Sequence, residues 1–334
     1  MKNRVNYSTD VIGWLLEPED ALVRYATLVE LLGKGENDPE VIATREAIMQ
    51  SLPVQRILSR QYPGGYWLKP ESFYMRGGKY KGTVWNVILL AEMGVEESDE
   101  RIRNACEFLL QWSQDPRSGG FAVNGTAEGG EHDQVISCLT GNLVWSMIRF
   151  GMLADSRIQH GIDWIATYQR ADDGVRGVPT DWPYHYKNCW GAHTCMMGVV
   201  KTLKALAEIP QDRRSPEVKR KINRLAEFIL SHRLYQSSHH PGRNAKEAWT
   251  NFGFPLFWMT DALEMLEILL KSGIRDERME DAIKLVRSKQ DENGRWKQEG
   301  GYLTNRTLVK FEANGEPSKR VTLKALKILQ EWNH

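Results

Sequence analysis

The stretch that decides the fold is "AIKLVRSKQDENGRW", which runs from Ala282 to Trp296. Apolar residues recur in it at helical spacing until the pattern stops at Gln290. A turn signal centred on Gly294 follows, and then Trp296. The stretch therefore predicts a helix, a glycine turn and an aromatic residue that folds back on the helix.

The same pattern recurs along the chain, in looser form. The other copies are Val54–Trp67, Ala105–Phe121, Gly161–Gly177 and a degenerate one at Ala226–Ser238. Successive copies lie 53 to 63 residues apart when they are anchored on Gln61, Gln114, Gln169, His232 and Gln290. This period suits one helical hairpin with its two connections, so the sequence indicates a repeat architecture.

Partner helices are predicted between these copies. They are Thr83–Gly94, Cys138–Gly151, Cys195–Ile209, Leu256–Gly273 and Ser318–Trp332, and Asp20–Gly33 pairs with Pro39–Met49 at the start. They are apolar on more than one face, as expected of an inner layer buried on both sides. We therefore predict an all-α chain in which residues 1–334 form a single α/α toroid of about five to six hairpins.

The pattern of Leu285, Gln290, Gly294 and Trp296 resembles the QW repeat of the squalene-cyclase and protein-prenyltransferase superfamily. In that family the glutamine ties a helix end to the following turn, so the resemblance implies the α/α toroid more strongly than any chemistry. It also implies a central cavity for a hydrophobic, isoprenoid substrate.

The chain departs from the family's catalytic motifs. It has neither the Asp-x-Asp-Asp acid of class II terpene cyclases nor the Asp-x-Cys of the prenyltransferase zinc site. The nearest acidic run, Asp172-Asp173-Gly174, falls in one of the repeated turns. The resemblance therefore indicates a divergent member whose site must be sought elsewhere.

Composition excludes several classes of partner. The 44 Lys and Arg residues balance 43 Asp and Glu, and no long basic run is present, so we expect no nucleic-acid partner. No apolar window is long enough for a transmembrane segment, and the first residues lack a signal-peptide pattern. The four cysteines form no spaced disulfide framework, which predicts a cytoplasmic, reduced protein.

Candidate catalytic residues come from the loops that lead into the inner helices. His132 next to Asp133 has the composition of an oriented acid or base, although Asp133 could equally cap the next helix. His185 and His193 lie in a second such loop, and Asp261 stands in an otherwise apolar helix. For Asp261 the alternative is a polar residue at a helix interface with a satisfied partner.

Candidate cavity residues are aromatic or amide side chains near the same helix starts. They are Trp85, Asn142, Tyr184, Trp190, Asn251 and Trp258. Aromatic faces bind apolar ligands and attract cations. These residues therefore predict a pocket for a small, hydrophobic molecule.

The segment "CWGAHTC" offers Cys189, His193 and Cys195 as candidate zinc ligands, with Cys138 as a further donor. The spacing matches no standard zinc motif. Buried core thiols and reactive thiols are the two other interpretations, and the sequence leaves all three open.

The function predicted from these features is an enzyme of terpene cyclase, isomerase or hydratase type that uses acid–base chemistry. Two alternatives stay open: a carbohydrate-active lyase or hydrolase, since Trp and Tyr also stack on sugars, and a non-catalytic toroid that binds a lipid or a protein.

Overall fold

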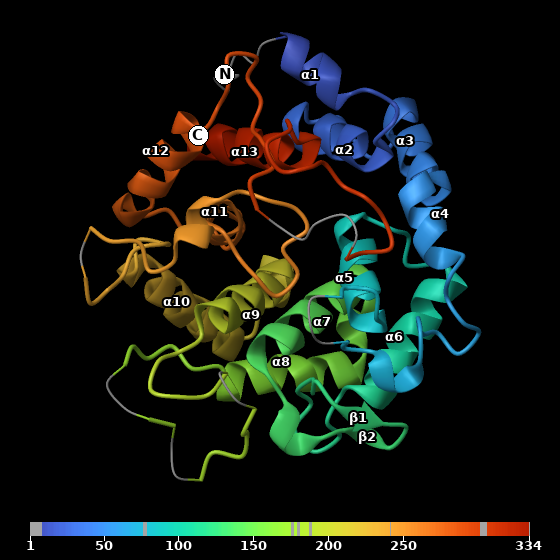
Figure 1. Cartoon of the computed structure of the whole chain (residues 1–334), viewed down its shortest axis with the longest axis vertical. Coiled ribbons are helices and arrows are strands. Elements are labelled where there is room, and N and C mark those ends of the chain that lie inside the picture. The colour runs from blue at the N-terminus through green and yellow to red at the C-terminus, as the bar shows by residue number, and fades with distance from the viewer. Residues whose placement is uncertain are drawn as a thin grey trace. The chain divides into compact units, whose positions relative to one another are not determined.

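The computed structural model describes residues 9–75, 79–174, 177–178, 181–186, 189–240, 242–300 and 306–333. Helices dominate these residues, and the predicted all-α class is confirmed (Figure 1). The only paired strands in the described part are β1 (Gly125–Thr126) and β2 (Gly129–Gly130), which form a small antiparallel hairpin. No helix in these ranges is long and apolar enough to cross a membrane.

The described residues divide into two compact units. The first comprises residues within Met1–Ile57, His232–Leu256 and Asp261–His334, and the second comprises residues within Leu58–Ser231 and Phe257–Thr260. Each unit is considered by itself below. The single closed ring of hairpins stays a prediction.

The first unit contains the two ends of the chain. Its helices are α1 (Thr9–Leu15), α2 (Ala21–Ala26) with a π-helical turn Thr27–Leu31, α3 (Pro39–Gln50), most of α4 (Leu52–Leu58), α11 (Ala262–Lys271), α12 (Glu280–Ser288) and α13 (Lys319–Trp332). α13 packs against α2 and α11, and α12 packs against α11. The N- and C-terminal parts of the sequence therefore share one core.

The second unit has two layers of helices. Its helices are α5 (Thr83–Glu92), α6 (Glu100–Trp112), α7 (Ser137–Arg149), α8 (Ser156–Tyr168), α9 (Met196–Glu208) and α10 (Pro216–Ser231). Every residue of α7 from Ser137 to Ile148 is buried, whereas α6, α8 and α10 bury one face each. α7 packs against α5, α8 and α9, and α9 also packs against α10 (Figure 1). The prediction of an inner layer buried on both sides is confirmed for this unit.

The outer helices begin at a recurring cap. Asp99 and Asp155 accept the backbone N–H of the residue two positions on, which is an arginine in both cases. The arginine side chain returns to the same carboxylate, at 2.6 Å for Arg101 and 2.7 Å for Arg157. A carboxylate at a helix start satisfies free N–H groups and favours the helix dipole. This Asp-x-Arg pattern therefore fixes where α6 and α8 start.

The repeated turns are tied by the glutamines that anchor them. Gln61 and Gln114 each donate from Nε2 to a backbone carbonyl in the first turn of the next outer helix, at 2.7 Å to Arg101 and 2.7 Å to Arg157. Gln114 also donates to the carbonyl of Gly119 inside its own turn, at 2.9 Å. One amide group thus joins the end of one hairpin to the start of the next.

A second hydrogen bond joins three of the repeated turns to the inner helix that follows. The aromatic residue after the turn donates its backbone N–H to a buried threonine hydroxyl: Trp67 to Thr83 at 3.2 Å, Phe121 to Thr140 at 2.9 Å and Trp296 to Thr322 at 2.9 Å. The glycines of these turns, such as Gly119 at φ +80° and Gly294 at φ +77°, hold a left-handed conformation that other residues avoid. The sequence repeat is therefore also a repeat of hydrogen bonds.

One helix boundary differs from the prediction. The helix expected from Leu256 begins only at Ala262, because the Asp261 side chain caps it by accepting the backbone N–H of Glu264 at 2.7 Å. The residues before the cap, with Phe257 at φ +52°, are not helical. Asp261 is therefore a helix cap and not a residue inside the helix.

The threonine tie predicts the effect of Thr140→Val. The valine keeps the shape but leaves the buried N–H of Phe121 without its acceptor, which costs about 1–3 kcal/mol. Thr202→Val is the matched control, because the Thr202 hydroxyl bonds only to carbonyls of its own helix, Gly198 and Val199. Urea denaturation should show a clearly larger loss of unfolding free energy for Thr140→Val. Equal losses would contradict a tie between turn and helix.

The crossing of α7 and α9 predicts the effect of Gly141→Ala. A Cβ at Gly141 would lie 2.4 Å from the carbonyl carbon of Lys201, which is backbone and cannot rotate away. Overpacking of this kind costs about 1–3 kcal/mol. Gly13→Ala is the control, because a Cβ at Gly13 in α1 meets nothing within 4 Å, and alanine favours helix. Thermal unfolding should show a lower Tm only for Gly141→Ala; an unchanged Tm would mean that the helices are not in close contact there.

Candidate active site

The second unit pairs His132 with a carboxylate that the sequence analysis did not single out. His132 lies in a short 3-10 turn, His132–Gln134, just before α7. Its Nδ1 atom is 2.6 Å from Oδ2 of Asp115, which follows Gln114 in the second repeated turn. The side chain of Asp115 is 1% exposed, whereas that of His132 is 29% exposed. A buried carboxylate thus holds one nitrogen of a histidine ring that reaches the surface.

Local hydrogen bonds keep the buried Asp115 carboxylate charged. Burial acts to raise its pKa, but hydrogen bonds from Ser118, His132 and the backbone N–H of Arg117 outweigh burial and lower the pKa. Ser118 Oγ donates to Oδ2 at 2.5 Å, and the Arg117 N–H donates to Oδ1 at 3.1 Å. An ionised carboxylate accepts only, so the proton shared with His132 belongs to its Nδ1 atom.

With its Nδ1 proton donated to Asp115, His132 has its other ring nitrogen, Nε2, left for chemistry. A histidine oriented by a carboxylate in this way is the acid–base arrangement of many hydrolases and isomerases. The geometry of His132 therefore allows it to take up and return a proton.

Aromatic rings pack around this pair. Tyr184 is buried, and its ring centroid lies 5.5 Å from that of His132. Its hydroxyl accepts a hydrogen bond from the Trp164 indole N–H at 2.7 Å, and burial raises the pKa of Tyr184 to about 12. Tyr168, Trp182 and Trp190 place their ring centroids 5.2, 5.8 and 5.6 Å from Tyr184. We call Trp164, Tyr168, Trp182, Tyr184 and Trp190 the Tyr184 cluster.

A second aromatic group of the same unit gathers three of the other predicted cavity residues. Phe257 stacks on Tyr80 with ring centroids 4.9 Å apart, and Trp85 lies edge-on to both. Trp258 Nε1 lies 3.3 Å from the Tyr80 hydroxyl, and Asn142 Nδ2 donates to the Phe257 carbonyl at 3.0 Å. Trp85, Asn142 and Trp258 therefore lie close together, and the contacts named here involve no carboxylate and no histidine.

Three of the predicted catalytic residues lie on the surface. The side chains of Asp133, His185 and His193 are all exposed. The Asp133 carboxylate accepts from the Gln134 side chain at 2.9 Å, and its backbone carbonyl accepts the N–H of His185 at 2.9 Å. Asp133 does not cap α7, because the residue before that helix is Ile136. The prediction that Asp133 is the partner of His132 is wrong; Asp115 takes that place.

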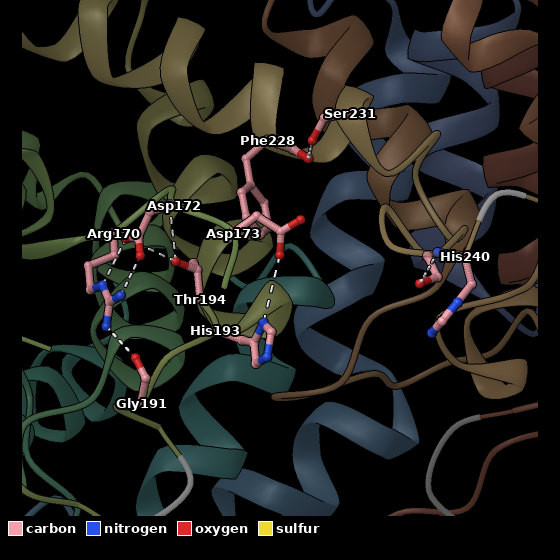
Figure 2. A network of polar contacts seen from close by, with 10 residues as sticks. Arg170, Asp172, Asp173, Gly191, His193, Thr194, Phe228, Ser231 and His240 are labelled. Atoms are coloured by element: carbon pink, nitrogen blue, oxygen red, sulfur yellow. Dashed lines mark hydrogen bonds and ion pairs between the residues drawn. The ribbon is translucent and has the colours of Figure 1, made fainter. Parts of the chain in front are cut away.

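His193 is close to the acidic turn of the third repeat (Figure 2). Its Nδ1 atom lies 3.8 Å from Oδ1 of Asp173, and the His193 side chain is 66% exposed. The neighbouring Asp172 carboxylate pairs with Arg170 and with the Thr194 hydroxyl, and Arg170 also donates to the Gly191 carbonyl at 2.6 Å (Figure 2). These contacts join the turn to the following loop and therefore have a structural role.

The three predicted zinc ligands do not converge. The sulfur atoms of Cys189 and Cys195 and a ring nitrogen of His193 do not all lie within 4.8 Å of one another. Burial, followed by the nearby Cys195, raises the pKa of Cys189 to about 12, and burial also raises the pKa of Cys138. A cysteine must lose its proton to bind zinc. The trio therefore does not fit a preformed zinc site. The buried-thiol interpretation agrees with Cys138, which is buried, whereas Cys189 and Cys195 are half-buried.

The remaining two predicted residues belong to the first unit. Asn251 is exposed. Asp261 is buried, and both of its carboxylate oxygens accept backbone N–H groups, from Glu264 at 2.7 Å and from Gly253 at 3.1 Å. Burial nevertheless raises the pKa of Asp261 to about 7. These bonds match the alternative of a buried carboxylate with satisfied partners.

The sequence did not single out Asp115, because an aspartate at this place in the repeat has a structural role in closing the turn. The last repeat has an aspartate at the same place, Asp291, which accepts the turn N–H groups of Asn293 and Arg295, both at 2.9 Å. Asp115 performs the same turn-closing task toward Arg117. The added bond to His132, 17 residues on, leaves no local signal in the sequence.

The raised pKa of Asp261 predicts a pH dependence of stability. The folded protein holds a proton that the unfolded chain releases above its ordinary pKa of 3.8. The contribution of this group is therefore greatest below about pH 4 and is lost as the pH rises to about 7. In Asp261→Asn, urea midpoints measured between about pH 4 and pH 7 should no longer show this decline in stability. The substitution also removes the acceptor for the Gly253 N–H, which lowers stability at every pH.

Asp155→Asn provides the matched control, because Asp155 is also a helix cap. Hydrogen bonds from Arg157 lower its pKa despite partial burial, so its contribution is present above pH 4 and is lost as the pH falls. The two variants should change the pH profile in opposite directions. A profile that Asp261→Asn leaves unchanged would contradict a protonated Asp261 in the folded state.

Comparison with known proteins finds remote likenesses among solved structures. No protein-family model and no curated protein matches the chain. A protein from Actinoplanes is similar with a TM-score of 0.43 and 13% identity, over 97% of this chain and 89% of that one. A variant of the type II terpene cyclase MstE from Scytonema, solved with geranylgeranyl dihydroxybenzoate, is similar with a TM-score of 0.43 and 15% identity, over 94% and 86%. The apo form of another MstE variant is similar with a TM-score of 0.42 and 14% identity, over 96% of each chain. Because the sequence identities and the TM-scores are low, the function has to be inferred from the chain's own residues.

Proposed function

We propose that this protein is an enzyme that moves a proton on a hydrophobic, isoprenoid-type small molecule, with His132 as the acid–base residue. The observation that carries the proposal is the 2.6 Å contact between His132 Nδ1 and the buried, ionised Asp115. A charge buried to this degree is costly unless it is paired. A paired charge that orients a partly exposed histidine is typical of an active site.

The surroundings of His132 support an apolar ligand. Of the Tyr184 cluster, Trp164 and Tyr184 are buried, whereas Tyr168, Trp182 and Trp190 are only half-buried. Half-buried aromatic rings beside a catalytic group are the surfaces on which hydrocarbon chains and flat ligands pack. The resemblance of the repeats to the QW pattern is the reason for choosing an isoprenoid within this class.

The indole N–H of Trp182 supports a ligand that carries oxygen. It is buried and has no hydrogen-bond acceptor among the residues that the structure describes. A buried donor usually has a partner. An alcohol or carbonyl oxygen of the substrate would supply one, next to Trp190, whose ring centroid lies 5.2 Å from that of Trp182.

The proposal predicts loss of activity without unfolding in His132→Gln. Purified protein is first screened by thermal shift with geranylgeraniol, farnesol, their diphosphates and a set of oligosaccharides, and the stabilising compound is then followed for conversion by mass spectrometry. Because general acid–base groups contribute about 10²–10⁴-fold, His132→Gln should lower kcat at least about a hundredfold. Asp115→Asn should do likewise.

His240→Gln is the control, because His240 is exposed and belongs to the first unit. It should keep the wild-type rate. Full activity in His132→Gln would refute the proposed role of His132. Stabilisation by oligosaccharides and not by isoprenoids would transfer the proposal to a carbohydrate-active enzyme, and binding without conversion would favour a non-catalytic lipid carrier.

A further inference from the structure

Hydrogen bonds continue on the buried side of the His132–Asp115 pair. Ser118 Oγ donates to Asp115 Oδ2 at 2.5 Å. The same Oδ2 atom meets His132 Nδ1 at 2.6 Å. Ser118, Asp115 and His132 thus form one row of contacts that ends at a half-buried imidazole.

The number of protons fixes the direction of these contacts. Ser118 has one hydroxyl proton, which it donates in a hydrogen bond to the ionised Asp115. The backbone N–H of Arg117 donates to the other oxygen of the same carboxylate, Oδ1, at 3.1 Å. The Ser118 and His132 side chains therefore both donate to the Asp115 carboxylate.

We infer that Ser118 is a positioning residue that holds the Asp115 carboxylate and thereby keeps His132 in the tautomer with its proton on Nδ1, so that Nε2 acts as a base toward the substrate. This inference rests on the proposed function in so far as it invokes a substrate. The tautomer itself is a property of the free protein. A carboxylate that already accepts two donors on Oδ2 has its charge fixed in place. It cannot donate to His132, so the opposite tautomer has no partner at Nδ1.

The tautomer restricts the class of reaction. Nε2 takes a proton from an O–H group or from a C–H group next to a carbonyl; the electron pair of that bond stays on the substrate. The new N–H makes an imidazolium, whose charge faces Asp115, and the proton later returns to another atom of the product. An imidazolium is a weak acid, and protonation of an isolated alkene needs a far stronger one. The site is therefore built for isomerisation by removal and return of a proton, and not for starting a cyclisation by alkene protonation.

The test is nitrogen-15 NMR of the free protein, with histidine labelled and the pH set where imidazoles are neutral. The wild type should show His132 with Nδ1 protonated, by at least about tenfold over the other tautomer, because hydrogen bonds to charged groups are worth about 1.5–3 kcal/mol. Asp115→Asn should lose this preference. Ser118→Ala should weaken it, and Ser118→Thr, which keeps the hydroxyl, should retain it.

Tyr168→Phe is the control, because the Tyr168 ring belongs to the Tyr184 cluster, with its centroid 5.2 Å from that of Tyr184, but lies outside the Ser118–Asp115–His132 contacts. It should leave the tautomer ratio unchanged. A wild-type His132 with Nε2 protonated, or a ratio that Ser118→Ala leaves unchanged, would overturn the inference.

The two proposals fail in different ways. A correct tautomer together with full turnover in His132→Gln would remove the proposed function and leave the positioning network in place. Loss of turnover in His132→Gln together with an Nε2-protonated His132 would keep the proposed function and remove the inference about Ser118.

Discussion

The structure depends on the hydrogen bonds that join each repeated turn to its neighbours. A threonine hydroxyl inside a buried helix accepts the N–H of the aromatic residue after the turn, as Thr140 does for Phe121 and Thr322 for Trp296. These N–H groups are buried, and an unpaired buried N–H is expensive. Three of the repeated turns are thereby joined to the inner helix that follows each of them.

The candidate site is built on the second of these turns, which contains Asp115. Asp115 and Asp291 share a place in the repeat, and both accept N–H groups of their own turn. Only Asp115 also meets a histidine, because the loop after it returns to the turn through β1 and β2 and brings His132 back. A turn held by such hydrogen bonds is a suitable support for a catalytic carboxylate, because the fold then fixes the positions of Asp115 and His132 before any ligand binds.

Much of the fold could be predicted because its signals are local. The helical period, Gly294 and Trp296 lie within one short stretch, and the indole of Trp296 does fold back to donate to the Val286 carbonyl at 2.7 Å. The start of α11 could not be predicted, because apolar spacing continues through residues 256–260 and only the cap at Asp261 ends it. For the candidate site, the sequence singled out His132 but placed it with its neighbour Asp133, whereas the carboxylate in contact with it is Asp115. Its true partner is brought near by the path of a loop, for which periodicity carries no information.

The central claim is that the ligand binds against the Tyr184 cluster, next to His132 Nε2. A crystal structure of the full chain with geranylgeraniol tests this most directly. The account predicts density for the alcohol along the rings of Trp182 and Trp190, with its oxygen within hydrogen-bonding distance of His132 Nε2. Density at Trp85 and Phe257, or in the first unit next to Asp261, would contradict it and would move the active site away from the His132–Asp115 pair.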